Sequence, residues 1–309
     1  MPLDFSTIGL IGKQSIEHDV RTLKSVVKTL EKYSKKILLD EKTARLLGRR
    51  TRLTRTDICA KSTLIVTLGG DGTLLKTARH ARKNFPPILS INIGRLGFLT
   101  ECTPQDLEKK LKLMCSGKYK IDARSMLSIT VHKKAARTPQ SPSATTSNQI
   151  LALNDAVINQ GAFARLIKMS VQIDNLKAAS FKADGLIIAT PTGSTGHSLS
   201  AGGPIIHPKV DGMVITPICP VLLSMRPIVI PDNRTIRIRI ETARRSDSGG
   251  AQILPLGLTI DGQHTIHLDY EDEIIISRAP QVLNLIRATD RNYYKTLNEK
   301  LGWGYEKSS

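Results

Sequence analysis

Apolar residues follow two different periods along the chain. In the first 115 residues or so, short apolar runs alternate with segments in which apolar residues recur every three or four positions. The apolar runs predict buried strands at 5–12, 37–39, 62–68 and 87–93. The helical spacing predicts helices at 16–33, 43–47, 74–83 and 104–115, the last with Thr103 as its N-cap. This alternation of strand and helix predicts an α/β domain with a doubly wound parallel sheet.

From residue 118 onward the pattern changes to short β-prone runs, which predict an antiparallel all-β domain. The expected strands are at 126–131, 151–159, 166–173, 186–190, 214–217, 228–230, 235–241, 258–260 and 273–276. Between the first two of them, 133–149 is rich in Ser, Thr and Pro and has no periodicity, which predicts a surface loop. A final helix is predicted at 293–301.

The 309 residues are enough to bury two separate cores, and two domains are therefore expected. Residues 1–117 are assigned to the α/β domain and 118–282 to the β-rich domain. The C-terminal segment, 283–309, is expected to pack back on the first domain.

Charge adds one constraint on partners. Lysine and arginine number 45 against 27 acidic residues, a formal net charge of +18, which suggests an anionic partner. The basic residues are spread in short pairs, aromatic residues make up only 4% of the chain, and no RNA-binding or zinc-finger pattern accompanies them. We therefore expect no nucleic-acid partner and interpret the charge as a solvated basic surface that helps to attract nucleotides.

The four cysteines show no C-x-x-C pairing and the N-terminus has no signal-like apolar run, which predicts reduced thiols in the cytoplasm. No stretch approaches the roughly 18 uninterrupted apolar residues of a membrane helix, so no membrane association is expected. The seven histidines lack the spacing of a structural zinc site, and no metal ligand is assigned.

A glycine-rich turn, 69–73 (GGDGT), follows the strand expected at 62–68. Glycines allow backbone N–H groups to approach phosphate oxygens closely, and the helix that follows adds a dipole that favours anions. Asp71 in this turn is suited to accept a proton from an attacking hydroxyl or to help coordinate magnesium, which are the two tasks that phosphoryl transfer gives to carboxylates. An ordinary glycine turn, in which the aspartate bonds its own backbone, is the alternative interpretation.

A second glycine-rich stretch, 191–196 (PTGSTG), continues into 198–204 (SLSAGGP). Small hydroxylated residues interleaved with glycine can contact a nucleotide through side-chain oxygens and close backbone. The alternative is a turn between strands, but the stretch is longer than a turn requires. The chain has no G-x-x-x-x-G-K-[ST] P-loop and no protein-kinase motif set, so glycine backbone, basic side chains and magnesium would have to hold the phosphates.

The turn at 69–73 resembles the signature of the superfamily that contains NAD kinases, diacylglycerol kinases, sphingosine kinases and 6-phosphofructokinases. Further stretches are similar to the NAD kinase family of the bacterial type: 92–100 (NIGRLGFLT), Asn154-Asp155, 184–208 (DGLIIATPTGSTGHSLSAGGPIIHP), 215–229, 261–263 and 293–304. The resemblance covers nearly the whole chain. It implies a phosphofructokinase-like α/β domain and transfer of the γ-phosphoryl group of ATP to the 2′-hydroxyl of the adenosine ribose of NAD, with Mg²⁺ or another divalent cation accompanying ATP.

The same resemblance implies roles for individual residues. Asp71 would activate the 2′-hydroxyl, while Asn154 and Asp155 would bind NAD through its ribose hydroxyls and base. Asp184 would contact the nicotinamide side of NAD, in some members across a subunit boundary. The remaining nucleotide-binding candidates are Gly72, Arg95, Phe98, Lys182, Thr195, Gly196, His197, Ser200 and Gln263.

Structural roles remain open for several of these residues. Asn154 and Asp155 also suit a β-turn, Asp184 suits a strand-end cap, and Phe98 suits an apolar core. His197 departs from the family pattern, because most bacterial members have Ala-Tyr where this chain has Gly196-His197. An imidazole there can still stack on a base, and the change affects the expected nucleotide affinity rather than the reaction.

Two other functions share part of the pattern. A lipid kinase of the diacylglycerol or sphingosine type would have the same glycine turn, but the stretch 184–208 argues against it. A non-catalytic regulator that binds NAD or NADP on the same fold would not need Asp71 together with Asn154 and Asp155. The expected partners are therefore NAD and ATP as substrates, and the resemblance implies a homodimer or homotetramer.

Overall fold

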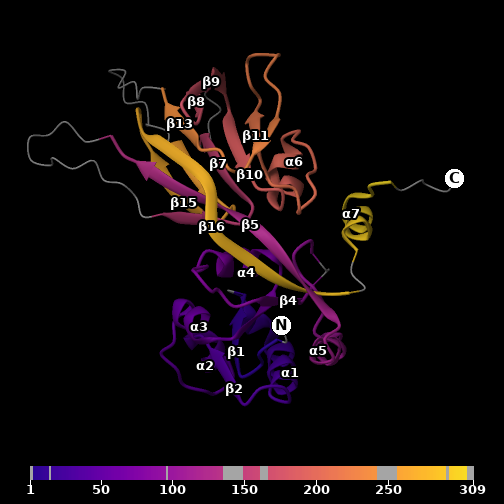
Figure 1. The fold of residues 1–309 in the computed structure, drawn as a ribbon. Coiled ribbons are helices and arrows are strands. Elements are labelled where there is room, and N and C mark those ends of the chain that lie inside the picture. Colours follow the sequence, from indigo (N-terminus) through magenta and orange to yellow (C-terminus); the bar gives the residue numbers. More distant parts are fainter. Residues whose placement is uncertain are drawn as a thin grey trace, which may run out of the picture. The chain divides into compact units, whose positions relative to one another are not determined.

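The computed structural model describes residues 3–13, 15–94, 97–134, 149–160, 166–241, 256–289 and 292–304. The chain forms two compact units, the first made of 1–123 with 283–309 and the second of 124–282 (Figure 1). Two long strands, β5 (Tyr119–His132) and β16 (Glu273–Ala288), carry the chain from one unit into the other. The domain boundaries expected from the sequence, at 117 and 283, stay a prediction.

The first unit contains a parallel sheet in the order β2-β1-β3-β4, with the end of β16 beside β4. Its strands are β1 (Thr7–Gly12), β2 (Lys36–Leu39), β3 (Leu64–Gly69) and β4 (Ile88–Asn92). Its helices are η1 (Ile16–Asp19), α1 (Val20–Leu30), α2 (Glu41–Leu46), α3 (Arg55–Lys61), α4 (Asp71–Ala78), α5 (Leu107–Cys115) and α7 (Tyr293–Leu301).

Helices cover both faces of this sheet. Alternate residues of a strand point to opposite sides, so neighbouring residues of β1 show which helices lie on each side. Ile8 and Leu10 of β1 belong to the apolar core shared with α1 and α5. Gly9 between them faces α3, since a Cβ at this position would lie 2.5 Å from Cγ2 of Ile58. The doubly wound α/β arrangement predicted from the sequence is thus confirmed.

The second unit is antiparallel. One of its sheets has the order β16-β13-β8-β9, and β6 pairs with β5. The other has the order β12-β11-β10-β7-β14-β15. The strands are β6 (Ile150–Ala152), β7 (Asp155–Gln160), β8 (Ile167–Ile173), β9 (Leu176–Ala183), β10 (Gly185–Ala189), β11 (Gly212–Ile218), β12 (Ile228–Pro231), β13 (Ile236–Ile240), β14 (Leu256–Ile260) and β15 (His264–Leu268).

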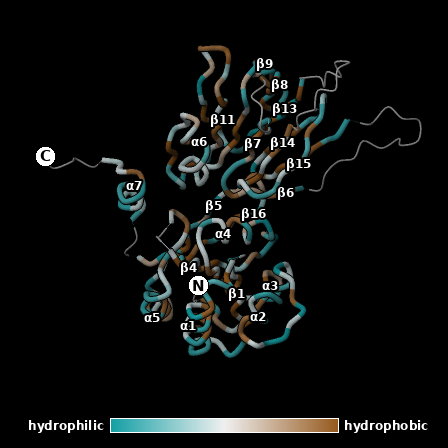
Figure 2. Tube along the Cα trace, turned by 180° about the vertical axis from the view of Figure 1, so that it is seen from behind, coloured by the Kyte–Doolittle hydropathy of each residue, from teal (hydrophilic) through white to brown (hydrophobic). Residues whose placement is uncertain are grey.

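The two sheets of the second unit share one apolar core. Met169 and Ile236 come from the first sheet, Ile158 and Leu186 come from the second, and all four are buried in the same cluster. Apolar segments concentrate along these strands (Figure 2). A short 3-10 turn, η2 (Gly193–Thr195), and a single helical turn, α6 (His197–Ser200), follow β10. The antiparallel β domain predicted from the sequence is confirmed.

Several predicted elements need correction. Thr103 is not the N-cap of α5, because the helix begins at Leu107 after Asp106, and the Thr103 hydroxyl donates to Oδ2 of Asp106 instead (2.8 Å). The helix expected at 16–33 starts as the 3-10 turn η1 and ends at Leu30. Helix α3 and strands β9 and β15 were not predicted, and β16 extends to Ala288 rather than ending at 276. Most of the predicted loop 133–149 lies outside the described residues.

Candidate functional site

The glycine turn GGDGT connects the buried strand β3 to helix α4. Gly69 ends the strand, where a Cβ would fall 2.2 Å from Oγ1 of Thr73, so the turn closes tightly only with glycine here. Gly70 is the N-cap residue and Asp71 is the first residue of α4. Asp71 therefore stands at the carboxyl end of a parallel strand and at a helix N-terminus, where negative charge is favoured.

The Asp71 carboxylate is held by backbone amides from the loop after β4. Phe98 N donates to Oδ2 (3.0 Å) and Leu99 N donates to Oδ1 (3.2 Å). Gly97 lies against the same carboxylate, since a Cβ there would be 2.2 Å from Oδ1. An ionised carboxylate can accept about four hydrogen bonds, so two amide donors leave acceptor capacity for a substrate hydroxyl.

The loop that supplies these amides is itself braced. The hydroxyl of Thr100, fully buried, accepts from Gly97 N at 2.7 Å. Phe98 is half-buried, and its backbone contributes to the site through the Asp71 contact. Gly72 is exposed in the first turn of α4, and Arg95 lies outside the described residues.

In the second unit a pocket of about 350 Å³ opens beside the start of β7 and the end of β14. The sequence-predicted residues Asn154, Asp155 and His197 all line it. The other lining residues are Val157, Asn159, Thr259, Asp261 and Gly262. The structure thus brings the Asn-Asp pair and the helical turn that begins at His197 to one cavity.

Asp261 organises the floor of this pocket, although it was not among the predicted site residues. Its Oδ1 accepts from Asn154 N (2.7 Å) and Asp155 N (3.2 Å), and its Oδ2 accepts from Leu153 N (3.1 Å). These bonds divert three amides from strand pairing, which explains why the single strand expected at 151–159 is broken into β6 and β7. Asp261 adopts a left-handed backbone with φ of 49° in the turn between β14 and β15.

Both side chains of the Asn-Asp pair have features of ligand-binding groups. The Oδ1 atom of Asn154 is buried and has no hydrogen-bond partner among the described residues. Asp155 is 5% exposed, and burial raises the pKa of its carboxyl to about 7, with the negative charge of Asp261 adding to the effect. Buried polar groups without partners and shifted carboxyls are typical of binding sites.

The second glycine-rich stretch lies directly against this pair. Gly193 approaches the backbone so closely that a Cβ would fall 2.1 Å from the carbonyl oxygen of Asn154. At Gly196 a Cβ would lie 3.9 Å from Nδ2 of Asn154 and 4.0 Å from Oδ2 of Asp155. Thr195 is half-buried and its hydroxyl donates to the Thr192 carbonyl (3.4 Å).

The remaining predicted residues of this unit do not line the pocket. Ser200 ends the single helical turn α6 and is exposed, as is Lys182 at the end of β9. Asp184, between β9 and β10, is half-buried and its N–H donates to the Ile218 carbonyl (3.0 Å). Gln263 follows Gly262 in the turn before β15 and donates its N–H to the Ile260 carbonyl (3.0 Å).

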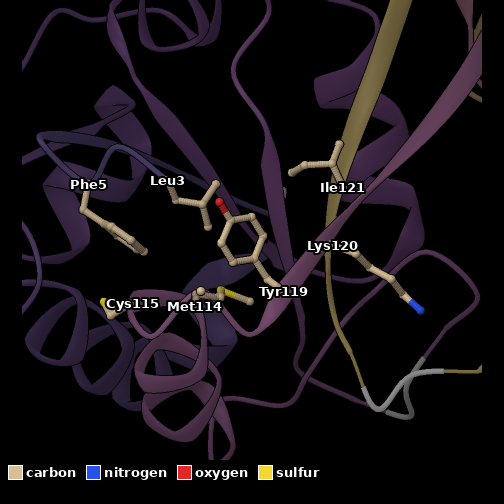
Figure 3. A pocket seen from close by; sticks show the side chains of 8 residues that line it. Leu3, Phe5, Met114, Cys115, Tyr119, Lys120 and Ile121 are labelled. Atoms are coloured by element: carbon tan, nitrogen blue, oxygen red, sulfur yellow. The ribbon is translucent and has the colours of Figure 1, made fainter. Parts of the chain in front are cut away.

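A larger hollow, about 610 Å³, lies in the first unit between the N-terminal segment, the end of α5 and the start of β5 (Figure 3). Its lining is mostly apolar, with Phe5, Met114 and Tyr119 among the side chains, and the Lys120 ammonium points away from them. None of the predicted site residues lines this hollow. It is not a candidate for the site predicted from the motifs.

Three further observations concern metal-binding groups, membrane-spanning helices and cysteines. Within the described ranges, no group of three or more His, Cys, Asp or Glu side chains is arranged to hold a metal ion. The helices of the described part of the chain include none that is long and apolar enough to cross a membrane. All four cysteines are free thiols, Cys59 and Cys102 buried, Cys115 and Cys219 exposed.

Comparison with known families gives two matches that follow each other along the chain. Residues 8–119 match the ATP-NAD kinase N-terminal domain, and 153–288 match the ATP-NAD kinase C-terminal domain. Among curated proteins, the NAD kinase of Geotalea daltonii is 42% identical over 250 residues, which is 81% of this chain and 82% of that protein. The NAD kinase of Cellvibrio japonicus is 36% identical over 314 residues and 97% of both chains.

Solved structures agree. The crystal structure of yeast NADH kinase complexed with NADH superposes with a TM-score of 0.83 at 27% identity, covering 99% of this chain and 89% of that one. An NAD kinase from Archaeoglobus fulgidus, solved in complex with ATP, superposes with a TM-score of 0.66 at 22% identity, over 96% of this chain and 98% of that one. The second likeness concerns the fold alone.

Proposed function

This chain belongs to the NAD kinase family, and on that premise we propose how its own residues carry out the reaction. The enzyme transfers a phosphoryl group from ATP to NAD. The reaction places the γ-phosphoryl group on the 2′-hydroxyl of the adenosine ribose and yields NADP and ADP. The comparisons support neither the lipid kinase nor the non-catalytic regulator that the sequence left as alternatives.

Asp71 is the catalytic residue, acting as general base or orienting group for the attacking 2′-hydroxyl. The observation that carries this assignment is the carboxylate held by two backbone amides, Phe98 N at 3.0 Å and Leu99 N at 3.2 Å. Bonds from rigid amides fix the carboxylate while leaving lone pairs for the hydroxyl proton. Positioning of this kind supplies most of the catalysis in phosphoryl transfer, where the protein does little covalent chemistry.

The triphosphate of ATP lies along the glycine turn. Gly72 is exposed and has no side chain to keep a phosphate away from the turn, and the N-terminus of α4 favours negative charge. Arg95, which lies outside the described residues, is the proposed cationic contact to the phosphates. Charge reversal of Arg95 is expected to raise the KM for ATP, and an unchanged KM would exclude it.

NAD occupies the pocket of the second unit. The buried Oδ1 of Asn154 accepts a hydrogen bond from the ligand, and the carboxyl of Asp155 accepts from the vicinal ribose hydroxyls. Thr195, Gly196 and Ser200 contact the adenine, and the imidazole of His197 at the edge of the same pocket stacks on a base.

The remaining residues complete the nucleotide contacts. Phe98 lines the adenosine pocket through its half-buried ring. Asp184 binds the nicotinamide side of NAD, and the exposed Lys182 and the turn residue Gln263 contribute further polar contacts.

Magnesium accompanies ATP in this proposal. The protein offers isolated carboxylates rather than a cluster, since no metal-binding group of three acidic, His or Cys residues is found among the described residues. Mg²⁺ is commonly bound through one or two carboxylates together with substrate phosphates and water, which fits such a donor set. When bound with ATP the ion would neutralise the triphosphate charge, and Asp71 would be the carboxylate of the glycine turn available to it.

We also propose that the enzyme is a cytoplasmic homodimer or homotetramer. The free state of all four cysteines supports a reducing compartment. Sedimentation equilibrium of the purified chain measures the number of subunits, and a monomer over the whole concentration range would refute the assembly.

The test is a coupled assay. Purified protein is incubated with ATP, Mg²⁺ and NAD, and NADP is detected with an NADP-specific dehydrogenase. Asp71→Asn is expected to lower kcat by about 10²- to 10⁴-fold, the usual contribution of a general base, while the Kd for NAD stays unchanged. Full activity in this variant would refute the role of Asp71, and absence of NADP with the wild type would refute the reaction.

A further inference from the structure

The peptide group between Phe98 and Leu99 is hydrogen-bonded at both ends. Its N–H, from Leu99, donates to Oδ1 of Asp71 at 3.2 Å. Its carbonyl, from Phe98, accepts from Nη2 of Arg287 at 3.3 Å. The guanidinium of Arg287 and the carboxylate of Asp71 are therefore linked through a single rigid peptide plane. Hydrogen bonds arranged in series polarise one another, so the cationic donor also strengthens the amide bond to Asp71.

Arg287 is a buried side chain that binds several groups of this loop. It lies near the end of β16 and is only 3% exposed. Besides Phe98 it reaches the carbonyl of Thr100 through Nη1 (3.3 Å). It also contacts Glu101 Oε2 through Nη1 (3.5 Å) and Asp122 Oδ2 through Nε (3.3 Å). Four acceptors arranged around one planar fork are a geometry that arginine satisfies and lysine does not.

A second cation lies close to the carboxylates around Arg287. Glu101, 4% exposed, accepts from Ala288 N through Oε1 (3.0 Å), and the same oxygen lies 3.6 Å from Nζ of Lys110. Two cations, Arg287 and Lys110, thus face two carboxylates, Glu101 and Asp122. Buried ion pairs seldom add much net stability compared with apolar packing, and they are often retained because they fix one arrangement. Here the ion pairs fix the loop whose backbone amides bond the Asp71 carboxylate.

We propose that Arg287 is a positioning residue for phosphoryl transfer, which holds the Asp71 carboxylate in its reactive orientation through the Phe98–Leu99 peptide. The proposal rests on the catalytic role of Asp71 stated above. Arg287 itself acts at one remove, through its bonds to the backbone of this loop and its contacts with Glu101 and Asp122.

The first test is Arg287→Lys, which keeps the buried charge and removes the fork. We expect kcat to fall by about 10- to 100-fold, because a displacement near 1 Å is enough for such a loss, with the KM for NAD and ATP within about threefold of wild type. Arg278→Lys is the matched control. Arg278 lies on the same strand and binds Asp211 and Asp232, and its kcat is expected to stay within about twofold.

A double-mutant cycle separates positioning from a general structural effect. If Arg287 acts through Asp71, adding Arg287→Lys to Asp71→Asn changes the residual kcat by less than about twofold, because the group it orients is already lost. The same fold-loss in both backgrounds would overturn the proposal, as would a wild-type kcat in Arg287→Lys. A fully active Asp71→Asn would refute the catalytic role of Asp71 itself, which is a different outcome.

Asp122→Asn is the second variant that tests the positioning role if Arg287→Lys does not fold. Asp122 holds the guanidinium at Nε, and its side chain is 18% exposed, so the loss of its charge is more easily tolerated. We expect kcat to fall by about two- to tenfold with unchanged KM values, and the loss to disappear in the Asp71→Asn background. A kcat equal to wild type, or a loss that persists beside Asp71→Asn, would contradict the positioning role.

Discussion

Two aspartates of this enzyme, one in each unit, sit in opposite electrostatic surroundings. Asp71 begins helix α4, and two backbone amides from the loop after β4 bond its carboxylate. Asp155 begins strand β7, but the amides at 153–155 bond Asp261 instead, which leaves Asp155 buried beside a second negative charge. The first carboxylate is held by two fixed donors, while burial and repulsion disfavour the charged form of the second.

This difference matches the two roles proposed above, in which Asp71 keeps one orientation and Asp155 binds a ligand. A carboxylate with fixed donors keeps one orientation, as a catalytic group requires. A buried carboxyl with a raised pKa lowers the stability of the free protein and regains that free energy when ligand hydroxyls donate to it. The predictions below test the comparison at each carboxylate.

The largest effect is expected from Gly97→Ala. A Cβ at this position would lie 2.2 Å from Oδ1 of Asp71, and the carboxylate would have to move out of its two amide bonds. We expect kcat to fall by about 10²- to 10³-fold with little change in the Kd for NAD. Gly94→Ala is the control in the same loop, since the nearest atom to its Cβ would be 3.9 Å away. Equal kcat values in the two variants would show that Asp71 needs no fixed position.

Asp155→Asn is expected to stabilise the free protein at high pH. The folded pKa of about 7 lies above the ordinary 3.8, so between these values the folded state keeps a proton that the unfolded state has lost. Wild-type stability therefore decreases as pH rises from about 4 to about 7, and the penalty is complete above 7. The variant carries no such penalty and should gain on the order of 2 kcal/mol at pH 8, with the gain shrinking toward pH 4.

Urea unfolding of wild type and Asp155→Asn at pH 4.5 and pH 8 measures this effect. A gain that is the same at both pH values would contradict a raised pKa at Asp155. Binding of NAD, measured on the same samples by calorimetry, should weaken in the variant, because the amide offers one acceptor oxygen where the carboxylate offers two.

The sequence predicted most of the fold because its local signals agree with the tertiary structure. The buried strands β1, β3 and β4 were found within two residues at each end, since each is a short and mainly apolar run. Helix α7 matches its predicted bounds. Helix α3 was missed although Thr54 and Asp57 form a capping box, a signal that was present in the sequence.

Other elements could not be predicted because they depend on partners distant in sequence. Strand β9 is largely exposed, with polar residues and alanines, and its pairing with β8 rather than its own hydrophobicity determines it. The break between β6 and β7 depends on Asp261, more than 100 residues away. Arg287 lies beyond the last strand predicted from the sequence, 273–276, and only the structure shows that it binds the loop around Asp71.

The motifs that name the family located the glycine turn and the Asn-Asp pair, but their environments required the structure. The raised pKa of Asp155 follows from burial and from Asp261, neither of which a motif reveals. All the nucleotide contacts stay predictions, and three of the residues concerned, Lys182, Asp184 and Gln263, do not line the pocket.

Asp261→Asn is the counterpart of Asp155→Asn, and it should have the opposite sign. The substitution replaces one oxygen that accepts from buried amides with an NH₂ group that cannot accept. The lost bonds are expected to destabilise the protein by about 1 to 2 kcal/mol at pH 8, more than the relief of repulsion at Asp155 restores. Urea unfolding at pH 8 compares the two variants directly. If both were stabilised, repulsion between the two aspartates would outweigh the amide bonds.

The smallest effect is expected at the exposed edge of the pocket, where neither burial nor a second charge amplifies a change. His197 begins the helical turn α6 and lines the pocket with its side chain exposed. His197→Tyr supplies a larger ring for stacking, worth about 1 kcal/mol, and should lower the Kd for NAD by about fivefold at unchanged kcat. Calorimetric titration measures the Kd, and His197→Ala controls for loss of the imidazole. No hydrogen bond or ion pair of the described residues links His197 to Asp155 or Asp261. A change in kcat would therefore mean that the pocket edge influences the chemistry, and the distinction between a fixed catalytic carboxylate and a separate binding pocket would be wrong.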